Sequence, residues 1–353
     1  FSRAALHYAR VWGADLIHLN DWQTGLVPAY SLIDDIRIAT VFSIHNLAYQ
    51  GNHPPSILQR IGIPAALYRP ENGIEFFGSA SFMKGGIALA DRITTVSPTY
   101  AREIQTPAFG AGLDGLLRFR ARDLHGILNG IDVEAWNPLT DPSISATYSS
   151  RQLAHKDLDR QALLAELRLD GNGPLVVAVS RLAHQKGIDI LHASVPALLE
   201  RGASLAVLGD GDTAIEHAFS RAAAAFPRRI AAFFRFDDAM SRRFYAGGDF
   251  FIMPSRYEPC GLGQMIAQRY GTVPIVRHTG GLADTVDNGQ TGFSFGDASP
   301  AGLMGAVDRA FAVWNTKEWP KLRRRCMRLD RSWGRSAEHY EEVYRAALGP
   351  SLS

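Results

Sequence analysis

A lone carboxylate beside glycines is the clearest chemical feature of this sequence. Glu258 lies in the stretch 253–264, MPSRYEPCGLGQ, after the apolar run at 250–252 and before a helix-compatible segment. Pro259 stands where a helix could begin, and Gly261 and Gly263 have no side chain to keep a ligand from the backbone N–H groups. We therefore predict a strand-to-helix turn that offers a pocket for anions and hydroxyl groups beside one acid.

Two cations occur in an earlier segment of similar kind. Arg181 and Lys186, in SRLAHQKG, follow an apolar run and lie near the expected start of a helix. An arginine fork and a lysine point charge can together neutralise a pyrophosphate. The alternative is a surface pair, but helix N-termini disfavour cations, which favours the anion-binding interpretation.

Two glycine-rich segments differ in what they indicate. The segment Thr279–Asp284, TGGLAD, runs into a possible helix, so Gly280 and Gly281 could present N–H groups to a phosphate or a sugar; a structural turn is about equally compatible. The segment 209–212, GDGD, superficially resembles a dinucleotide fingerprint but lacks the third glycine. We expect an ordinary strand-to-helix turn there.

The N-terminal third places polar residues at the ends of predicted strands. His45, beside Asn46, could contact a substrate, although a structural, hydrogen-bonded histidine is commoner. Asp21 precedes Trp22 and could equally be a helix N-cap.

Other chemistries lack the residues that they need. Ile266 stands eight residues after Glu258, where a second acid on the same helical face would be, so double-acid hydrolysis has little support. Neither a Cys/His cluster nor a DxD-like pair suggests a metal, and we expect no cofactor. What remains is metal-free transfer from a leaving group held by cations and helix dipoles.

Composition narrows the class of protein. The 353 residues carry a net charge of +2, which does not indicate nucleic acid or a membrane surface as a partner. The sequence contains no apolar run long enough to span a bilayer. The two cysteines, Cys260 and Cys326, fit a reducing compartment, and we expect a cytoplasmic protein. The sequence opens at Phe1 and enters a helix-like segment directly, so we expect a fragment.

The chain alternates short apolar runs with helical patterns, which is typical of parallel sheets with crossover helices. Strands are predicted at 15–19, 39–44, 92–96, 124–128, 175–179, 204–208, 230–234, 249–253 and 273–276. A Pro-, Ser-, Thr- and Asp-rich stretch at 136–150 separates two sets, so we predict two α/β domains joined near Asn137. Because ligands bind beyond the carboxyl ends of such strands, the polar residues that follow them predict a ligand cleft between the domains.

Taken in order, these motifs resemble the bacterial glycogen synthase and starch synthase family of retaining glycosyltransferases. The likeness covers nearly the whole chain. The motifs are HLNDWQTG, SIHNLAYQG, FGSASFMKGGIALADRITTVSPTYAREI, AGLDGLL, ILNGIDVEAWNP, SRLAHQKGID, PSRYEPCGLGQM and HTGGLADTV.

The resemblance implies a GT-B fold of two Rossmann-like domains. It divides the chain into an acceptor-side domain at 1–134 that lacks its first strands, a nucleotide-sugar-binding domain at 135–334, and a helix at 335–353 that crosses back. The implied reaction moves glucose from ADP-glucose to the non-reducing end of an α-1,4-glucan with retention.

The resemblance also assigns roles to individual residues. Glu258 matches the essential acid, Arg181 and Lys186 the pair that stabilises the departing diphosphate, and His45 and Asp21 groups near the reacting sugar. The matching substrate-binding positions are Asn46, Asn129, Phe236 (against adenine), Cys260, Gly261, Leu262, Gly263, Gly280 and Gly281.

This sequence departs from the family at two points. The KTGGL loop that contacts the donor does not occur here, and Gly263 replaces a frequent Thr. The alternative function is therefore a catalytically silent, glucan-binding remnant. A phosphorylase would need a pyridoxal-bearing lysine, which the sequence does not locate.

Overall fold

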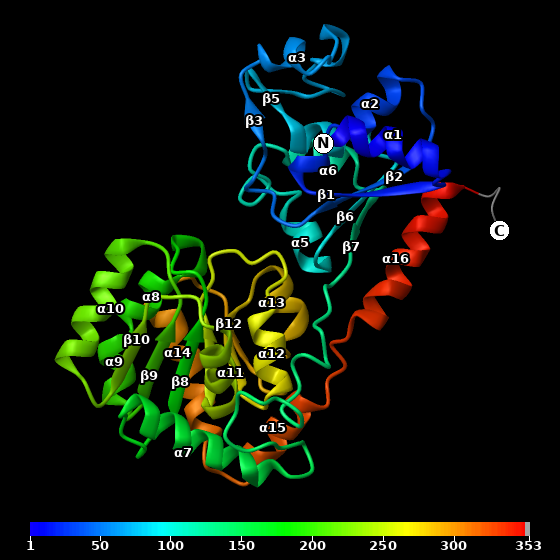
Figure 1. Ribbon diagram of the computed structural model, residues 1–353. Coiled ribbons are helices and arrows are strands. Elements are labelled where there is room, and N and C mark those ends of the chain that lie inside the picture. Colours follow the sequence, from blue (N-terminus) through cyan, green and yellow to red (C-terminus); the bar gives the residue numbers. More distant parts are fainter. Residues whose placement is uncertain (350–353) are drawn as a thin grey trace. The chain divides into compact units, whose positions relative to one another are not determined.

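The structure is a computed structural model in which residues 1–349 are described (Figure 1). It contains two compact units: unit 1 comprises Phe1–Asn129 and Gly334–Ser353, and unit 2 comprises Gly130–Trp333. The chain thus leaves unit 1 once and returns to it, so that unit 2 is an insertion within unit 1.

Unit 1 is built on a four-stranded parallel sheet in the order β1-β2-β6-β7, with a small antiparallel sheet β3-β5-β4. Its strands are β1 (Leu16–Asn20), β2 (Ala39–Ile44), β3 (Asn52–His53), β4 (Glu75–Phe76), β5 (Ser79–Ser81), β6 (Arg92–Thr95) and β7 (Leu124–Gly126). Its helices are α1 (Ser2–Trp12), η1 (Trp22–Thr24), α2 (Val27–Ile33), α3 (Ile57–Arg60), η2 (Ala65–Leu67), α4 (Phe82–Leu89), α5 (Pro98–Glu103), α6 (Asp114–Phe119) and α16 (Trp333–Leu348), the last of which begins at the end of unit 2.

The unit 1 sheet is covered on both faces, as the alternation of side chains along β2 requires. Phe42 packs toward α4, where Gly86 lies so close that an added Cβ would come within 2.5 Å of the ring. The preceding residue of β2, Val41, packs in a cluster with Ile127 and with Val343 of α16. Helix α16 therefore covers the opposite face of the sheet. Residues from beyond unit 2 therefore complete the core of unit 1.

Unit 2 contains a six-stranded parallel sheet in the order β10-β9-β8-β11-β12-β13. Its strands are β8 (Leu175–Val179), β9 (Ser204–Leu208), β10 (Ile230–Phe233), β11 (Phe250–Met253), β12 (Val273–Arg277) and β13 (Phe293–Phe295). Its helices are η3 (Leu153–His155), α7 (Lys156–Leu167), η4 (His184–Lys186), α8 (Ile188–Ala193), α9 (Val195–Glu200), α10 (Thr213–Ala225), α11 (Asp238–Gly247), α12 (Gly263–Arg269), α13 (Gly280–Thr285), α14 (Pro300–Val313) and α15 (Trp319–Met327).

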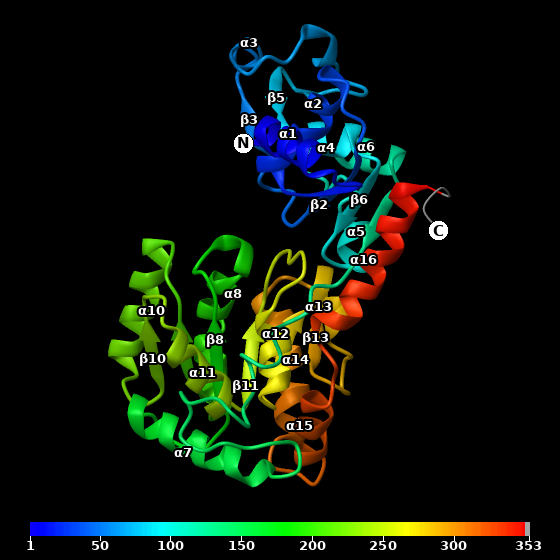
Figure 2. The same cartoon turned by 45° about the vertical axis from the view of Figure 1, so that its right-hand side comes forward.

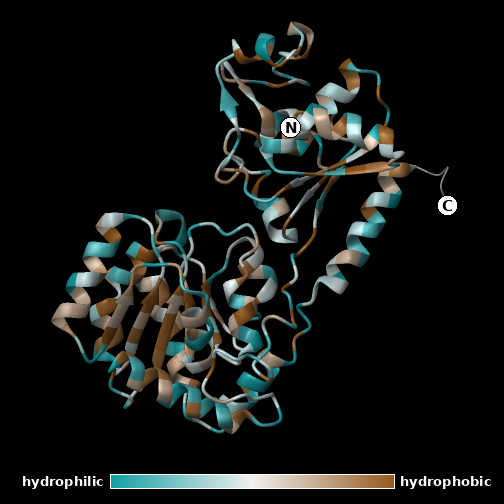
Figure 3. Cartoon of the chain, viewed as in Figure 1, coloured by the Kyte–Doolittle hydropathy of each residue, from teal (hydrophilic) through white to brown (hydrophobic). Residues whose placement is uncertain are grey.

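The unit 2 strands are largely apolar, as expected for strands with helices covering both faces, and Ser204, Arg277 and Ser294 are the exceptions. Figure 3 shows them as a continuous hydrophobic layer, and Figure 2 shows helices on either side of it. One face forms a large core with α8, α9, α10 and α14, in which Val176 and Phe250 are fully buried. On the other face, Gly248 at the end of α11 packs against Val177. Because helices cover both faces of this sheet, the strand ends are the places where polar side chains can gather.

All nine predicted strands are present, with ends that differ from the prediction by at most two residues. The sequence missed β13 and the small sheet β3-β5-β4, whose strands have only two or three residues. The predicted start of the helix after Glu258 was wrong: α12 begins at Gly263, not at Pro259, and Cys260 and Leu262 lie in bends. The GDGD segment is the expected ordinary turn, in which Asp212 caps α10 by accepting the N–H of Ala214 at 2.8 Å.

Candidate functional site

The topology of unit 2 marks one edge of its sheet as the natural ligand site. Strand β8 lies between β9 and β11. The chain first adds β9 and β10 on one side of β8, and then adds β11, β12 and β13 on its other side. In doubly wound sheets, ligands bind at the carboxyl ends of the strands where this reversal occurs. Arg181 and Lys186 follow β8 and Glu258 follows β11, so strand order brings these loops together.

Lys186 and Glu258 form a direct ion pair at this point. The Lys186 Nζ donates to Glu258 Oε2 at 2.6 Å, and both side chains are largely buried, at 15% and 6% exposed. The Ser255 hydroxyl donates to the same oxygen at 3.1 Å. Burial of a charge is tolerated when it is paired and hydrogen-bonded, as it is here. The acid is therefore held in place by two donors from two different loops.

Arg181 differs from Lys186 in its surroundings. Its side chain is exposed, and within residues 1–349 no hydrogen bond or ion pair of its guanidinium is found. An arginine in this state keeps its five N–H donors for a ligand. Arg181 is thus a cation that a ligand at this edge could bind, whereas the charge of Lys186 is already shared with Glu258.

Glycines allow the loops of this edge to approach one another closely. Gly187 has φ of 64°, and a Cβ added there would lie 2.0 Å from the Pro254 carbonyl oxygen. Gly280 and Gly281 pack in the same way against the carbonyl groups of Glu258 and Cys260. The Gly281 N–H also donates to the Glu258 carbonyl oxygen at 3.1 Å, so the glycine pair packs against the turn that carries Glu258 and is bonded to it.

The segment Cys260–Gly263 leads directly into α12. Leu262 is the N-cap of α12 and provides no side-chain cap, and its side chain is 46% exposed. The first N–H groups of a helix have no acceptor within the helix. Cys260 is buried, and its carbonyl accepts the Gln264 amide at 3.2 Å, which fixes the entry into the helix. The turn therefore directs helix N–H groups toward the edge that carries Glu258.

Phe236 lies in the loop after β10 and is 86% exposed. Strands β9 and β8 separate β10 from β11, which corresponds to about 14 Å at the usual strand spacing. The structure thus places Phe236 on the same edge of the sheet as Glu258 but away from the ion pair.

Unit 1 gathers its polar residues at the ends of β1 and β2. The Asp21 carboxylate accepts the His45 N–H at 2.8 Å, and the His45 Nε2 is hydrogen-bonded to Asn20 Oδ1 at 2.8 Å. Asp21 occupies the N-cap position of η1, as the N-cap alternative expects, but its side chain makes no cap hydrogen bond. Its φ of 57° is rare for a residue with a side chain. Asp21 instead ties the two strand ends together and orients the His45 backbone.

The two asparagines of unit 1 differ in how their side chains are used. Asn46 Oδ1 accepts the Ala48 N–H at 3.1 Å, which forms a turn. Asn129 Oδ1 is buried and has no hydrogen-bond partner. A buried acceptor without a donor is costly, so Asn129 retains an unused capacity for a polar contact.

A hydrogen-bonded network of polar side chains lies within the same two strands, at His18 of β1 and Ser43 of β2. His18 Nε2 is hydrogen-bonded to Ser43 Oγ at 2.6 Å and His18 Nδ1 to the Tyr344 hydroxyl at 2.7 Å, and Ser43 is also bonded to Thr94. Burial, with a smaller contribution from the charge of His45, lowers the pKa of His18 to about 4. The network therefore links β1, β2, β6 and α16 through a neutral imidazole.

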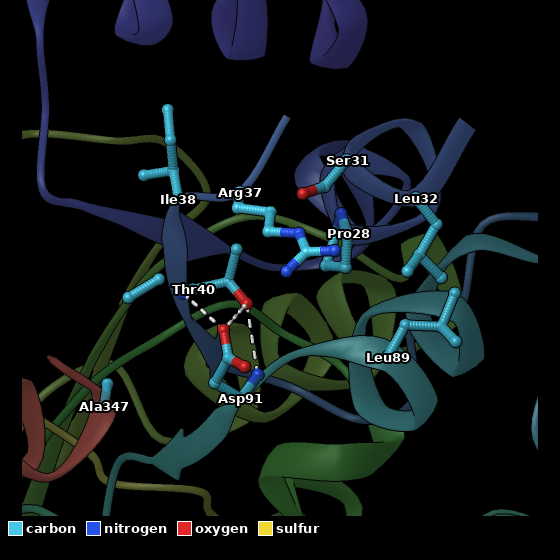
Figure 4. A pocket seen from close by; sticks show the side chains of 10 residues that line it. Pro28, Ser31, Leu32, Arg37, Ile38, Thr40, Leu89, Asp91 and Ala347 are labelled. Atoms are coloured by element: carbon cyan, nitrogen blue, oxygen red, sulfur yellow. Dashed lines mark hydrogen bonds between the residues drawn. The ribbon is translucent and has the colours of Figure 1, made fainter. Parts of the chain in front are cut away.

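A hollow of about 350 Å³ in unit 1 lies at the opposite end of β2 (Figure 4). Its carboxylate, Asp91, already accepts the backbone N–H and the hydroxyl of Thr40 at 2.7 and 2.8 Å. These bonds fix the register at the start of the strands and leave the hollow without a free acid. We therefore place the candidate site of unit 1 at the Asp21 end.

Sequence reasoning did not name as site residues the two groups that hold the acid and the histidine. Ser255 and Asn20 both belong to motifs quoted above, and each lies within three residues of a predicted site residue. No group of three or more His, Cys, Asp or Glu side chains within residues 1–349 could hold a metal ion. In the same range, no helix has the length and apolar character needed to cross a membrane.

Comparisons with known proteins agree on one group of enzymes. Residues 1–119 match the family described as starch synthase catalytic domain, and residues 173–312 match glycosyl transferases group 1. A glycogen synthase of Anaeromyxobacter dehalogenans (strain 2CP-C) is 51% identical over 94% of this chain and 72% of its own length. Glycogen synthase 1 of Methylococcus capsulatus is 48% identical over 96% of this chain and 71% of its own length.

A solved structure gives the same result for the fold. The catalytic domain of starch synthase IV from Arabidopsis thaliana, bound to ADP and acarbose, matches with a TM-score of 0.91. It is 36% identical in sequence, and the match covers 98% of this chain and 76% of that one.

Proposed function

Because the chain belongs to the glycogen synthase and starch synthase family of glycosyltransferases and has their GT-B fold of two Rossmann-like units, we propose that it uses ADP-glucose as donor. Glucose is transferred to the non-reducing end of an α-1,4-glucan, and the α configuration is retained. The similarity to a starch synthase solved with ADP supports this donor.

The Lys186–Glu258 pair at the carboxyl edge of β8 and β11 is the observation that carries the proposal. Transfer from a nucleotide sugar leaves a diphosphate whose negative charge grows as the bond to glucose breaks. Fixed donors aimed at such a charge contribute roughly 3 to 4 kcal/mol each to catalysis. In the proposed mechanism, Arg181 binds the diphosphate first, and Lys186 divides its charge between Glu258 and the diphosphate.

The remaining residues bind the two ends of the donor. Glu258 accepts hydrogen bonds from glucose hydroxyls, and the N–H groups from Cys260 to Gly263 bind hydroxyl and phosphate oxygens. Gly280 and Gly281 keep this turn in position. Phe236 stacks on the adenine, for which its high exposure and its distance from β11 are suited.

Unit 1 supplies groups to the sugar. We assign His45 a contact with the reacting glucose, with Asp21 orienting it, and Asn46 and Asn129 polar contacts to substrate. The orphaned Asn129 Oδ1 supports that last assignment, because a sugar hydroxyl would provide the missing donor.

The test is a transfer assay with glycogen as acceptor. We expect release of ADP from ADP-glucose, little reaction with UDP-glucose, and α-linked product by NMR. Glu258→Gln should abolish transfer because the amide cannot replace the paired carboxylate. The matched control is Glu166→Gln, which alters another ion-paired glutamate of unit 2, bonded to Arg243 at 2.9 Å and outside the site.

Each of these measurements has an outcome that would contradict the proposal. Absence of transfer from every nucleotide sugar would overturn the function, and a faster reaction with UDP-glucose would overturn the donor. A β-linked product would exclude retention. A near-normal rate for Glu258→Gln would remove the acid from the mechanism.

A further inference from the structure

The loops that carry Lys186 and Glu258 are joined by bonds outside the ion pair itself. The Arg256 N–H donates to the Gln185 carbonyl at 2.8 Å, and the Gln185 side-chain amide donates to the Tyr257 carbonyl at 3.4 Å. Each of these residues is adjacent, or next but one, to Lys186 or Glu258. The backbones of the two loops are therefore connected to each other.

The Arg256 side chain adds a stronger connection. Its two terminal nitrogens donate to both Asp189 oxygens at 2.7 Å each, and Nη1 also donates to the His184 carbonyl at 2.8 Å. A bidentate arginine–carboxylate pair fixes both distance and angle. Hydrogen bonding to Asp189 raises the pKa of Arg256, and that to Arg256 lowers the pKa of Asp189, so both stay charged near neutrality.

A third segment, the end of strand β12, bonds to the same residue. The Arg277 guanidinium, at the end of β12, donates to the Arg256 carbonyl. Arg256 belongs to the segment after β11. Its N–H and side chain are bonded to the segment after β8, and its carbonyl is bonded to the last residue of β12. Neither Arg256 nor Asp189 is bonded to the Lys186 or Glu258 side chains.

We propose that Arg256 and Asp189 form a clamp that sets the position of Lys186 relative to Glu258, and that both are positioning residues for glucose transfer. The clamp joins the helix that follows the Lys186 loop to the turn that carries the acid. This inference rests on the proposed roles of Lys186 and Glu258, but the clamp itself is a property of the loops.

The geometry explains why a clamp would matter here. The acid and the cation reach the site from separate loops, and a misplacement of about 1 Å can reduce a rate on the order of a hundredfold. A lysine at 256 would keep the charge, but its single ammonium nitrogen lacks the planar fork that donates in parallel to both carboxylate oxygens. We therefore expect Arg256→Lys to recover little of the lost activity.

The experiment compares Arg256→Ala, Asp189→Ala, the double variant and a matched control. The control is Arg201→Ala, which removes another bidentate pair of unit 2, between Arg201 and Asp308 at 2.5 and 3.1 Å, away from the candidate site. Three quantities are measured: hydrogen exchange of residues 181–187 and 254–263, the kcat and donor KM of glucose transfer, and the thermal unfolding midpoint.

Removal of either clamp residue should speed exchange in both loops and lower kcat at least about tenfold, with a smaller change in donor KM. The double variant should lose no more than the worse single variant, because the two side chains act as one unit. Arg201→Ala should lower the unfolding midpoint by a similar amount and leave loop exchange and kcat unchanged.

Unchanged exchange in either loop would overturn the clamp, as would kcat losses that multiply in the double variant or an equal loss in the control. If the unaltered chain transfers glucose from no nucleotide sugar, the proposed function fails. The exchange data still decide the clamp in that case.

Discussion

Acidification should weaken unit 1 through His18. The pKa of this ring is lowered from its ordinary 6.5 to about 4, so between these values the folded state binds fewer protons than the unfolded state. Stability therefore rises with pH in this window and is lost as pH falls from about 6.5 toward 4. The imidazole bonds to Ser43 and Tyr344 are the contacts that protonation would disturb.

The size of the effect follows from the two pKa values. Linkage between 6.5 and about 4 gives a loss of about 2 kcal/mol when the pH falls from 7 to 5. Solvent screening of the partly exposed ring makes this an upper bound. A loss of that size would raise the open population of unit 1 up to about thirtyfold.

Hydrogen exchange of β1, β2 and α16 amides at pH 7 and pH 5, corrected for intrinsic rates, measures this loss. A global unfolding curve would mix the two units, whereas exchange reports unit 1 alone. His18→Gln should remove most of the pH dependence. Tyr344→Phe is the control, because it removes a hydrogen bond but leaves the ring able to titrate. Equal losses in the unaltered protein and His18→Gln, or an NMR pKa near 6.5 for His18, would refute the reasoning.

Two pairs of substitutions and one chemical probe test other parts of the structure. Gly187→Ala should lower the free energy of unfolding in urea clearly more than Gly202→Ala. Both glycines have positive φ, but only an alanine at 187 would also place its Cβ against a backbone carbonyl. Gly202→Ala should lose about 1 to 2 kcal/mol. Burial raises the pKa of Cys326 to about 12, so its thiol should resist an aromatic disulfide reagent at pH 8 until the protein unfolds, measured in a Cys260→Ser background. Asp21→Asn keeps an acceptor for the His45 N–H and should unfold within about 1 kcal/mol of the unaltered protein, whereas Asp21→Ala should lose about 1 to 3 kcal/mol.

Different results would contradict each of these expectations. Equal costs at the two glycines would show that the loop after β8 can move away from its neighbour. Rapid labelling of the native protein would mean that Cys326 is reached without unfolding. An Asp21→Ala variant as stable as Asp21→Asn would show that the carboxylate does not hold the strand ends.

The strands were predictable from the sequence because parallel strands covered on both faces are continuous apolar runs. The runs at 39–44 and 204–208 gave strands with the predicted bounds. Strand β13 was missed because three residues, Phe293–Phe295, are too few to show a pattern. Periodicity also could not order the strands, and that order decides which loops become neighbours.

The candidate site was predictable as a set of loops but not as a set of contacts. Lys186 and Glu258 are 72 residues apart, and their pairing depends on β8 lying beside β11. The interpretation of Asp21 as an N-cap used only local sequence, whereas its side chain accepts the backbone N–H of His45, directly after the next strand. Pro259 was expected to begin a helix, but the close approach of Gly280 and Gly281 holds that turn in bends until Gly263.

The insertion of unit 2 into unit 1 has a consequence for synthesis on the ribosome. Unit 2 is continuous from Gly130 to Trp333 and can fold as soon as it has emerged. Unit 1 must wait for α16, because Tyr344 reaches His18 across 326 residues and Ser336 reaches Leu128 across 208. Unit 1 begins before unit 2 on the chain but matures after it, and its sheet face under α16 stays open to other nascent chains and chaperones in the interval.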